Sequence, residues 1–116
     1  MQYMFLICDE EAKQLEPGDP AYDALMADYA AFSEMVSKMG IMRGGERLQP
    51  VSTATCVQVR DGKTITTDGP YAETKEQFGG YYLLECKDLD QAIELAAQIP
   101  TAKDGTIEVR PIFDMG

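Results

Sequence analysis

The chain changes from a strand pattern to a helix pattern within GGYYLLECKDLDQAIELAAQIP, residues 79–100. Residues 80–86 are strand-like, with bulky apolar side chains that can serve both faces of a sheet. Asp88 and Gln91 then match a capping box, and apolar residues recur at helical spacing until a proline ends the pattern. Because residues 106–112 alternate again, this part of the chain predicts a strand–helix–strand unit.

The first third of the sequence repeats this order. Residues 3–8 form an apolar run of strand length, and a polar connection that can carry a helical turn follows. The next segment has Asp19 as a helix N-cap, a proline at the first helical position and apolar residues at spacings of three and four, so it predicts a helix over residues 20–39. Gly40 suits the left-handed residue that ends such a helix, and residues 41–48 resume an extended pattern.

A hairpin is predicted between the two units. Residues 53–60 alternate, and Asp61 and Gly62 form a strong two-residue turn signal that returns the chain into residues 63–67. This antiparallel pair places Asp68 at the end of a strand. The complete order predicts an α+β, ferredoxin-like βαββαβ fold with an inserted hairpin, in a single domain over residues 1–116.

Composition narrows the class of protein. Hydrophobic residues make up 45% of the 116 positions and charged residues 26%, which is typical of a globular protein, and no apolar stretch reaches the roughly 20 residues of a membrane helix. The apolar N-terminal run lacks a basic leader and continues directly into acidic residues, so it predicts a first strand rather than a signal peptide. We therefore expect a soluble protein with no membrane partner.

The net charge, the absence of histidine and the spacing of the cysteines limit the reactions and partners that this chain can have. The formal net charge of -10 disfavours direct binding to nucleic acid, and the absence of histidine excludes His-based triads and His metal ligands. Cys8, Cys56 and Cys86 are widely separated, and packed, reduced thiols in a cytoplasmic protein are the simplest interpretation. We predict neither a metal nor another cofactor.

The central strands carry apolar groups on both faces. Tyr3 and Phe5 alternate with Met4 and Leu6, and the strand from residue 80 shows the same property. Two helices can cover only one face of such a sheet, and the second face would leave a large apolar patch. We therefore predict a homodimer in which the two open faces meet.

A longer motif points to a family. Residues 68–76, DGPYAETKE, resemble the DGPFAETKE signature of the DGPF-domain group within the YCII-related proteins, with Tyr71 in place of Phe. The resemblance continues through Gly44-Gly45-Glu46-Arg47-Leu48, Gly79-Gly80-Tyr81-Tyr82 and Glu108-Val109-Arg110-Pro111. It implies a ferredoxin-like fold that pairs into a dimeric α/β barrel, and it agrees with the sheet argument.

The same resemblance has implications for function. YCII-related proteins have been proposed to be enzymes that use a His and Asp pair, but this chain has no histidine, so only an Asp remains. DGPF-type proteins are also commonly encoded beside extracytoplasmic-function sigma factors. The resemblance thus implies either a small-molecule enzyme or a protein with a regulatory association.

Candidate catalytic residues are Asp68, Tyr71 and Tyr81. A carboxylate at a strand end, held by a Gly-Pro turn, can act as a general base or accept a hydrogen bond from a ligand. The two phenols could stabilise developing charge. Each residue also has a structural alternative. Asp-Gly-Pro is a favourable turn sequence, in which the Asp side chain accepts backbone hydrogen bonds, and tyrosines often serve only in packing.

Candidate ligand-binding residues form two charged groups. Arg43, Glu46 and Arg47 flank the Gly44-Gly45 pair, where an arginine could clamp a carboxylate, and Glu73 and Lys75 follow the Gly-Pro turn. The alternatives are a strand-edge ion pair for the first group and a solvated charge run for the second.

The sequence leaves four functional interpretations open. The first is a homodimer of undetermined activity with a small-molecule pocket near the loop that begins at Asp68. The second is a lyase or isomerase that uses Asp68 as an acid or base. The third is a regulatory binding protein linked to a sigma factor. The fourth is a purely structural or interaction domain with no pocket.

Overall fold

The structure is a computed structural model and describes residues 1–115. Its strands are β1 (Gln2–Asp9), β2 (Met42–Arg47), β3 (Thr55–Arg60), β4 (Lys63–Asp68), β5 (Gln77–Glu85) and β6 (Thr106–Pro111). Its helices are α1 (Pro20–Lys38) and α2 (Leu89–Gln98), with short 3-10 turns η1 (Glu11–Lys13), η2 (Val51–Thr53) and η3 (Pro100–Lys103).

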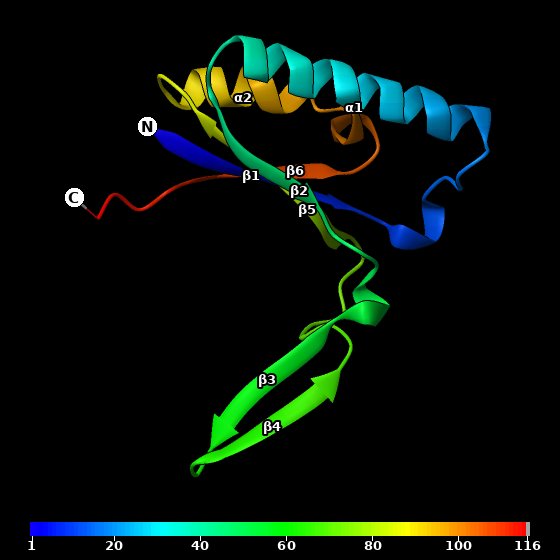
Figure 1. The fold of residues 1–116 in the computed structure, drawn as a ribbon, viewed down its shortest axis with the longest axis vertical. Helices are drawn as coiled ribbons and strands as arrows, with labels where there is room; N and C mark the ends of the chain where they lie inside the picture. The colour runs from blue at the N-terminus through cyan, green and yellow to red at the C-terminus, as the bar shows by residue number, and fades with distance from the viewer. Residues whose placement is uncertain (116) are drawn as a thin grey trace.

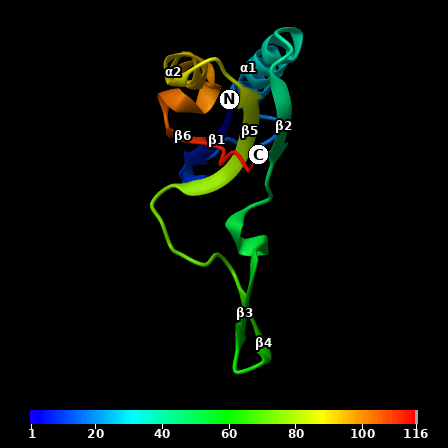
Figure 2. The same cartoon turned by 90° about the vertical axis from the view of Figure 1, so that its left-hand side faces the viewer.

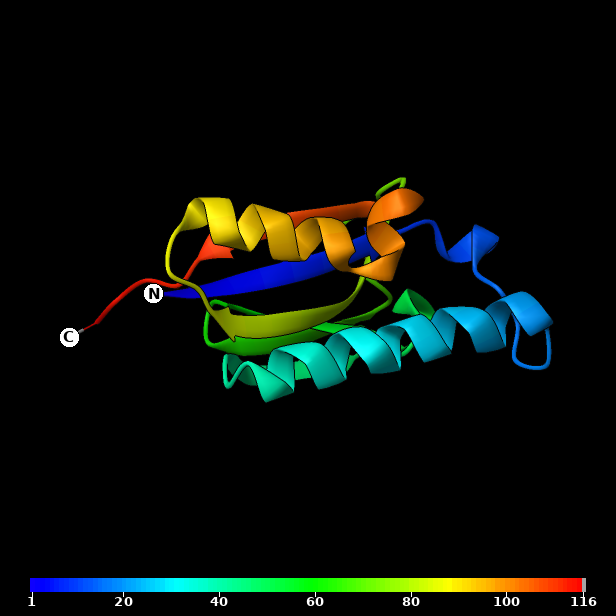
Figure 3. The same ribbon diagram turned by 90° about the horizontal axis from the view of Figure 1, so that it is seen from above.

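Four strands form one antiparallel sheet in the order β2-β5-β1-β6. Both helices lie on the same face of this sheet, as Figures 1 and 3 show. This is the predicted α+β, ferredoxin-like arrangement, with β3 and β4 inserted as a separate two-stranded sheet. No helix within residues 1–115 combines the length and the apolar character that crossing a bilayer requires.

The predicted caps determine where both helices begin. The Asp19 side chain accepts a hydrogen bond from the Ala21 N–H at 2.8 Å, and Asp88 accepts one from the Gln91 N–H at 2.9 Å. The Gln91 side chain accepts from the Lys87 N–H, one residue before the position expected for a capping box. Helix α1 ends at Lys38, one residue earlier than predicted, and Gly40 has the left-handed φ of 72° that was expected.

Strand β5 is longer than its sequence pattern indicated. It begins at Gln77 rather than at residue 80, because the ladder with β1 passes through an irregularity opposite the Ile7–Cys8 step. Ile7 pairs with Gly80 and Cys8 with Phe78, so Gly79 has no partner in this register. A glycine at such a bulge is typical of a bend that ends regular alternation.

The hydrophobic core lies between the sheet and the two helices. Phe5 and Leu84 are fully buried on the sheet, and Val36 is fully buried on α1. The Phe32 and Tyr82 rings pack at 5.0 Å between centroids with their planes tilted by 58°. The core is densest over the C-terminal half of α1, which leaves the N-terminal half of that helix less buried.

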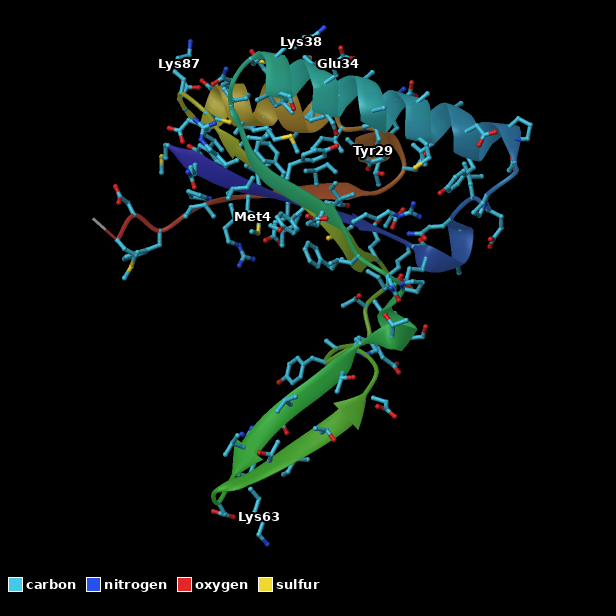
Figure 4. All side chains as sticks on the ribbon, viewed as in Figure 1. Met4, Tyr29, Glu34, Lys38, Lys63 and Lys87 are labelled. Carbon is cyan, nitrogen blue, oxygen red and sulfur yellow. The ribbon has the colours of Figure 1, made fainter. Side chains whose placement is uncertain are left out.

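The opposite face of the sheet has no helix over it. Met4, Leu6 and Leu83 are half-buried on this face, where Met4 pairs with Leu83 across β1 and β5. Figure 4 shows Met4 on the side of β1 that points away from the helices. We call the surface that Met4, Leu6, Tyr81 and Leu83 form the open face.

The inserted hairpin projects from the body of the protein. Figures 1 and 2 show β3 and β4 extending from the sheet on the side opposite the helices. Asp61 and Gly62 both have positive φ, 53° and 74°, as the predicted two-residue turn requires. The base is closed by a hydrogen bond from the Gly69 N–H to the Ala54 carbonyl at 2.7 Å.

Candidate functional site

A cavity of about 460 Å³ lies between the N-terminal half of α1 and the sheet. The end of β1, the strands β2 and β5, and the turns η1 and η3 supply its other walls. Its volume falls within the range of small-molecule sites, roughly 300 to 1,000 Å³. The cavity is therefore the first candidate for a functional site.

Gly45 and Gly80 border the cavity on the side of the sheet. Gly80 occupies a helix-facing position of β5, opposite Ile7 and two residues before Tyr82, and Gly45 on β2 pairs with Tyr82. A Cβ on Gly45 would stand 3.1 Å from the Tyr82 Cδ1 atom, and one on Gly80 would stand 2.9 Å from the Glu46 carbonyl oxygen. A side chain at either position would therefore meet neighbouring protein atoms, so both positions favour glycine.

Hydroxyl groups line the inner part of the cavity in two hydrogen-bonded pairs. The Ser33 hydroxyl on α1 lies 2.7 Å from the Tyr82 hydroxyl on β5. The Tyr29 hydroxyl on α1 hydrogen-bonds to Thr101 on η3, and Figure 4 shows Tyr29 below α1 beside that turn. Each hydroxyl can both donate and accept, so the pairs could reorient toward a polar ligand.

Burial affects the ionisation of Tyr29. Burial raises the pKa of this phenol above its ordinary value of 10.0, and the hydrogen bond with Thr101 only partly offsets that effect. The phenol therefore stays neutral across the physiological range. Tyr29 can offer a ligand either a hydrogen-bond donor or an acceptor.

One arginine reaches the cavity from the end of β2. The Arg47 Nη1 atom donates to the Tyr22 hydroxyl at 3.2 Å, and the guanidinium lies 6.0 Å from the centre of the Tyr22 ring. This contact joins the edge strand to the first turns of α1. A planar guanidinium so placed can bind a carboxylate or phenolate of a ligand.

Charged groups surround the opposite part of the rim. Asp9 accepts a hydrogen bond from the Gln14 side chain at 2.9 Å. Glu10 lies 3.5 Å from Lys13 and 4.0 Å from Lys75, the latter reaching over from the loop before β5. Asp9, Glu10 and Lys13 all line the cavity, so its entrance contains both signs of charge.

The loop that begins at Asp68 lies away from this cavity. Asp68 is an exposed residue that pairs with Thr55 at the base of the hairpin, and the Tyr71 side chain is 86% exposed. Glu73 is also exposed, and Arg43 donates to the Gly40 carbonyl at 2.9 Å beyond the end of α1. None of these four residues lines the cavity.

Besides Arg47, three predicted residues are placed at or near the cavity. Tyr81 and Glu46 line it. These two residues pair across β2 and β5, and strand alternation directs both side chains to the open face. Their backbone is thus the part that borders the cavity. Lys75 belongs to the rim through its contact with Glu10.

Sequence reasoning missed most of the inner wall. Tyr22 and Tyr29 belong to the residues whose spacing of three and four predicts the helix over residues 20–39, and Ser33 and Thr101 belong to no motif. Tyrosines seven residues apart on one helix face are a signal that could have been noticed, because phenols need hydrogen-bond partners when they are buried.

The described part of the chain offers no cluster of three or more Cys, Asp or Glu side chains that could hold a metal ion. The thiols are also separate from one another, and all three cysteines are free. Burial raises the pKa of Cys8 and of Cys86 above 9.0. These two thiols are therefore poor nucleophiles, because the thiolate is the reactive form.

Comparison with known proteins agrees with the signature. The model of the YCII-related domain matches residues 1–116. An uncharacterized protein of Rhizobium meliloti (strain 1021) is 33% identical over 114 residues, which are 97% of this chain and 92% of that protein.

Among solved structures, the chain resembles a dehydrochlorinase. The 5-chloro-2-hydroxyhydroquinone dehydrochlorinase of Burkholderia phenoliruptrix AC1100, solved in complex with 2,5-dihydroxybenzoquinone, superposes with a TM-score of 0.56. The sequences are 14% identical, and the match covers 97% of this chain and 94% of the other. At this identity the likeness concerns the fold.

Proposed function

Because this chain belongs to the YCII-related domain family, we propose that it binds a small organic molecule in the cavity under α1. The observation that carries the proposal is a space of about 460 Å³ lined by apolar side chains and by two hydroxyl pairs. Apolar walls with a few convergent polar groups are typical of ligand sites.

The polar groups favour a flat, oxygen-bearing ligand with a negative edge. The Tyr29 and Tyr82 hydroxyls suit ring hydroxyl or carbonyl groups, and Arg47 suits a carboxylate or phenolate at the open end. A hydroxylated benzoate or a hydroxyquinone has this combination. The dehydrochlorinase of similar fold was solved with such a quinone, which supports the choice of probe.

Calorimetric titration with 2,5-dihydroxybenzoquinone and with hydroxybenzoates tests the proposal. We expect saturable binding that weakens at least tenfold in Arg47→Ala, because the ligand loses its charged partner. Arg43→Ala is the matched control, since Arg43 is an exposed arginine of the same strand whose contact is with Gly40. No saturable binding to any probe, or equal losses in both variants, would contradict the proposal.

Acid–base catalysis is the second candidate. A carboxylate, Asp9, and a neutral phenol, Tyr29, line the same cavity, and one could accept a proton while the other donates a hydrogen bond. The Asp68 alternative remains a prediction, and it needs a substrate that contacts the exposed base of the hairpin. Product analysis with Asp9→Asn and Asp68→Asn would assign the residue, because only the variant of the true base should lose turnover.

We also propose that the protein is a homodimer joined through its open faces. Met4, Leu6 and Leu83 form an apolar surface on a sheet face that no helix covers, and a second copy is the simplest cover for it. Light scattering at micromolar concentration should give twice the mass of the chain. A monomer at that concentration would contradict the proposed dimer.

Two further expectations belong to this proposal. Free cysteines fit a cytoplasmic location, which cell fractionation would test. A regulatory link to an extracytoplasmic-function sigma factor would require stable co-elution with a sigma factor encoded beside this protein. Ligand binding without turnover would favour that regulatory function over catalysis.

A further inference from the structure

The inserted hairpin, residues 55–68, is more exposed than a stable isolated element should be. All six residues of β4 and five of the six in β3 are exposed, and the two strands pair only with each other. A lone two-stranded hairpin is marginally stable at best in water. Packing against another surface would explain why the chain keeps this element, which we call the arm.

The two faces of the arm differ in character. Val57 and Val59 lie on one face, with Thr66 and Thr64 as their cross-strand partners. The two valines are 62% and 60% exposed. The other face carries Gln58 and Arg60, with Ile65 and Lys63 as their cross-strand partners, and Ile65 is 44% exposed. Adjacent β-branched side chains on one face suit contact with an apolar surface.

The overall dimensions show that the arm extends outward. The radius of gyration is 16.3 Å, whereas a compact domain of this length has about 13 Å. The principal extents are 48, 45 and 20 Å, so the molecule is flat. The arm lies outside the compact body, and the described body does not cover its valine face.

The arm projects on the same side of the sheet as the open face. Figures 1 and 2 both show the arm projecting on the side of the sheet that carries the open face, opposite the helices. A second copy that covers the open face would therefore lie beside the arm. In a two-fold dimer each copy would contribute one arm to the other.

Charge also favours a second copy. The arm contains Arg60 and Lys63 against Asp61 and Asp68, so its formal charge is zero, while the whole chain carries -10. Lys63 lies at the tip, as Figure 4 shows. The bodies of two copies are both acidic and repel each other. A neutral arm with cations near its end can approach the acidic body of another copy without that repulsion.

We propose that the arm clasps a second copy of this chain, with the Val57 and Val59 face turned toward it. This inference rests on the homodimer proposed above and adds a second contact to it. The open faces form the centre of the interface, and the two arms close around its edge. The arm is then stable only in the dimer.

Two substitutions on neighbouring residues test the proposal. Val57→Glu and Gln58→Glu add the same charge to opposite faces of the same strand. Sedimentation analysis over a concentration series should show at least a tenfold higher dimer dissociation constant for Val57→Glu and less than a threefold change for Gln58→Glu. Equal effects, or no effect of either, would overturn the arm contact.

Removing the arm gives an independent test. Because the Gly69 N–H reaches the Ala54 carbonyl at 2.7 Å, residues 55–68 can be replaced by two glycines without moving the ends of the chain. The shortened chain should keep the circular dichroism spectrum of the body and dissociate at least tenfold more readily. Unchanged dissociation would overturn the proposal.

A third variant separates the arm from the dimer itself. Leu83→Glu places a charge in the open face, so it should produce monomers. Hydrogen exchange at the arm amides should then become at least tenfold faster than in the wild type, while the Phe5 amide in the core changes much less. If Leu83→Glu separates the copies but arm exchange is unchanged, the dimer stands and the arm contact is overturned. A wild-type monomer would overturn both.

Discussion

The Ser33 and Tyr82 hydroxyls lie 2.7 Å apart and connect α1 to β5 at the boundary between the core and the cavity. On the core side the Tyr82 ring packs against Phe32. On the other side the paired hydroxyls face the space under the N-terminal half of α1. One residue therefore contributes its ring to stability and its hydroxyl to the site.

Tyr82→Phe separates these two contributions. The variant keeps the ring packing but leaves the Ser33 hydroxyl without this partner, so we expect a loss of about 0.5 to 1.5 kcal/mol in the free energy of unfolding. Urea denaturation measures the loss. Ser33→Ala and the double variant complete the cycle, and strictly additive losses would show that the two hydroxyls do not interact.

Leu84→Ala tests the buried face of the sheet. Leu84 is fully buried in the core, and truncation should lower the free energy of unfolding by about 2 to 5 kcal/mol because it leaves a cavity. Leu89→Ala is the matched control on α2, where the side chain is 50% exposed, and should cost less than about 1 kcal/mol. Similar losses for the two leucines would contradict the assigned core.

The Gly44-Gly45 pair predicts a contrast between adjacent residues. A methyl group on Gly45 would meet the Tyr81 carbonyl oxygen and the Tyr82 ring at 3.1 Å, so Gly45→Ala should cost roughly 1 to 3 kcal/mol. At Gly44 the nearest atom is the Leu83 Cβ at 3.9 Å, an ordinary contact, so Gly44→Ala should be nearly neutral. Thermal unfolding of both variants measures this difference. A Gly44→Ala variant less stable than Gly45→Ala would contradict the prediction.

Tyr29 predicts a loss of stability in alkali. Burial holds its folded-state pKa above the ordinary 10.0, so above pH 10 the unfolded chain loses this proton while the folded chain still retains it. The contribution to stability is complete below pH 10 and declines as the pH rises toward the folded-state pKa. Chemical denaturation at a series of pH values should show a shallower alkaline decline for Tyr29→Phe than for the wild type, and identical declines would exclude this cause.

Ultraviolet titration of the phenols checks the same group directly. Subtracting the Tyr29→Phe curve from the wild-type curve isolates one tyrosine. Its midpoint should lie above 10 in the folded protein and return to the ordinary value in denaturant. A midpoint at or below 10 in the folded protein would mean that Tyr29 is not desolvated.

Local signals predicted the secondary structure well. Asp19, Asp88 and the Asp61-Gly62 turn have the expected geometry in the structure, because caps and tight turns depend on a few adjacent residues. The start of β5 was placed three residues too late, because the bulge at Gly79 interrupts the alternation that identifies a strand.

The candidate site was only partly accessible from sequence. Tyr81, Glu46 and Lys75 are at or near the cavity, whereas Asp68, Tyr71, Glu73 and Arg43 are not on its wall. The dense motif after Asp68 drew attention to one loop. The cavity instead draws its residues from five separate stretches of the chain, and no single stretch of sequence contains that pattern.

Sequence alone determined the elements, their order and the presence of a second apolar sheet face, since these follow from spacing and side-chain chemistry along the chain. Only the tertiary structure decided where the cavity lies. Helix α1 extends past the packed core, and Gly45 and Gly80 leave the sheet below it without side chains. Space of this kind depends on which residues meet across elements, and Ser33 meets Tyr82 from 49 positions away.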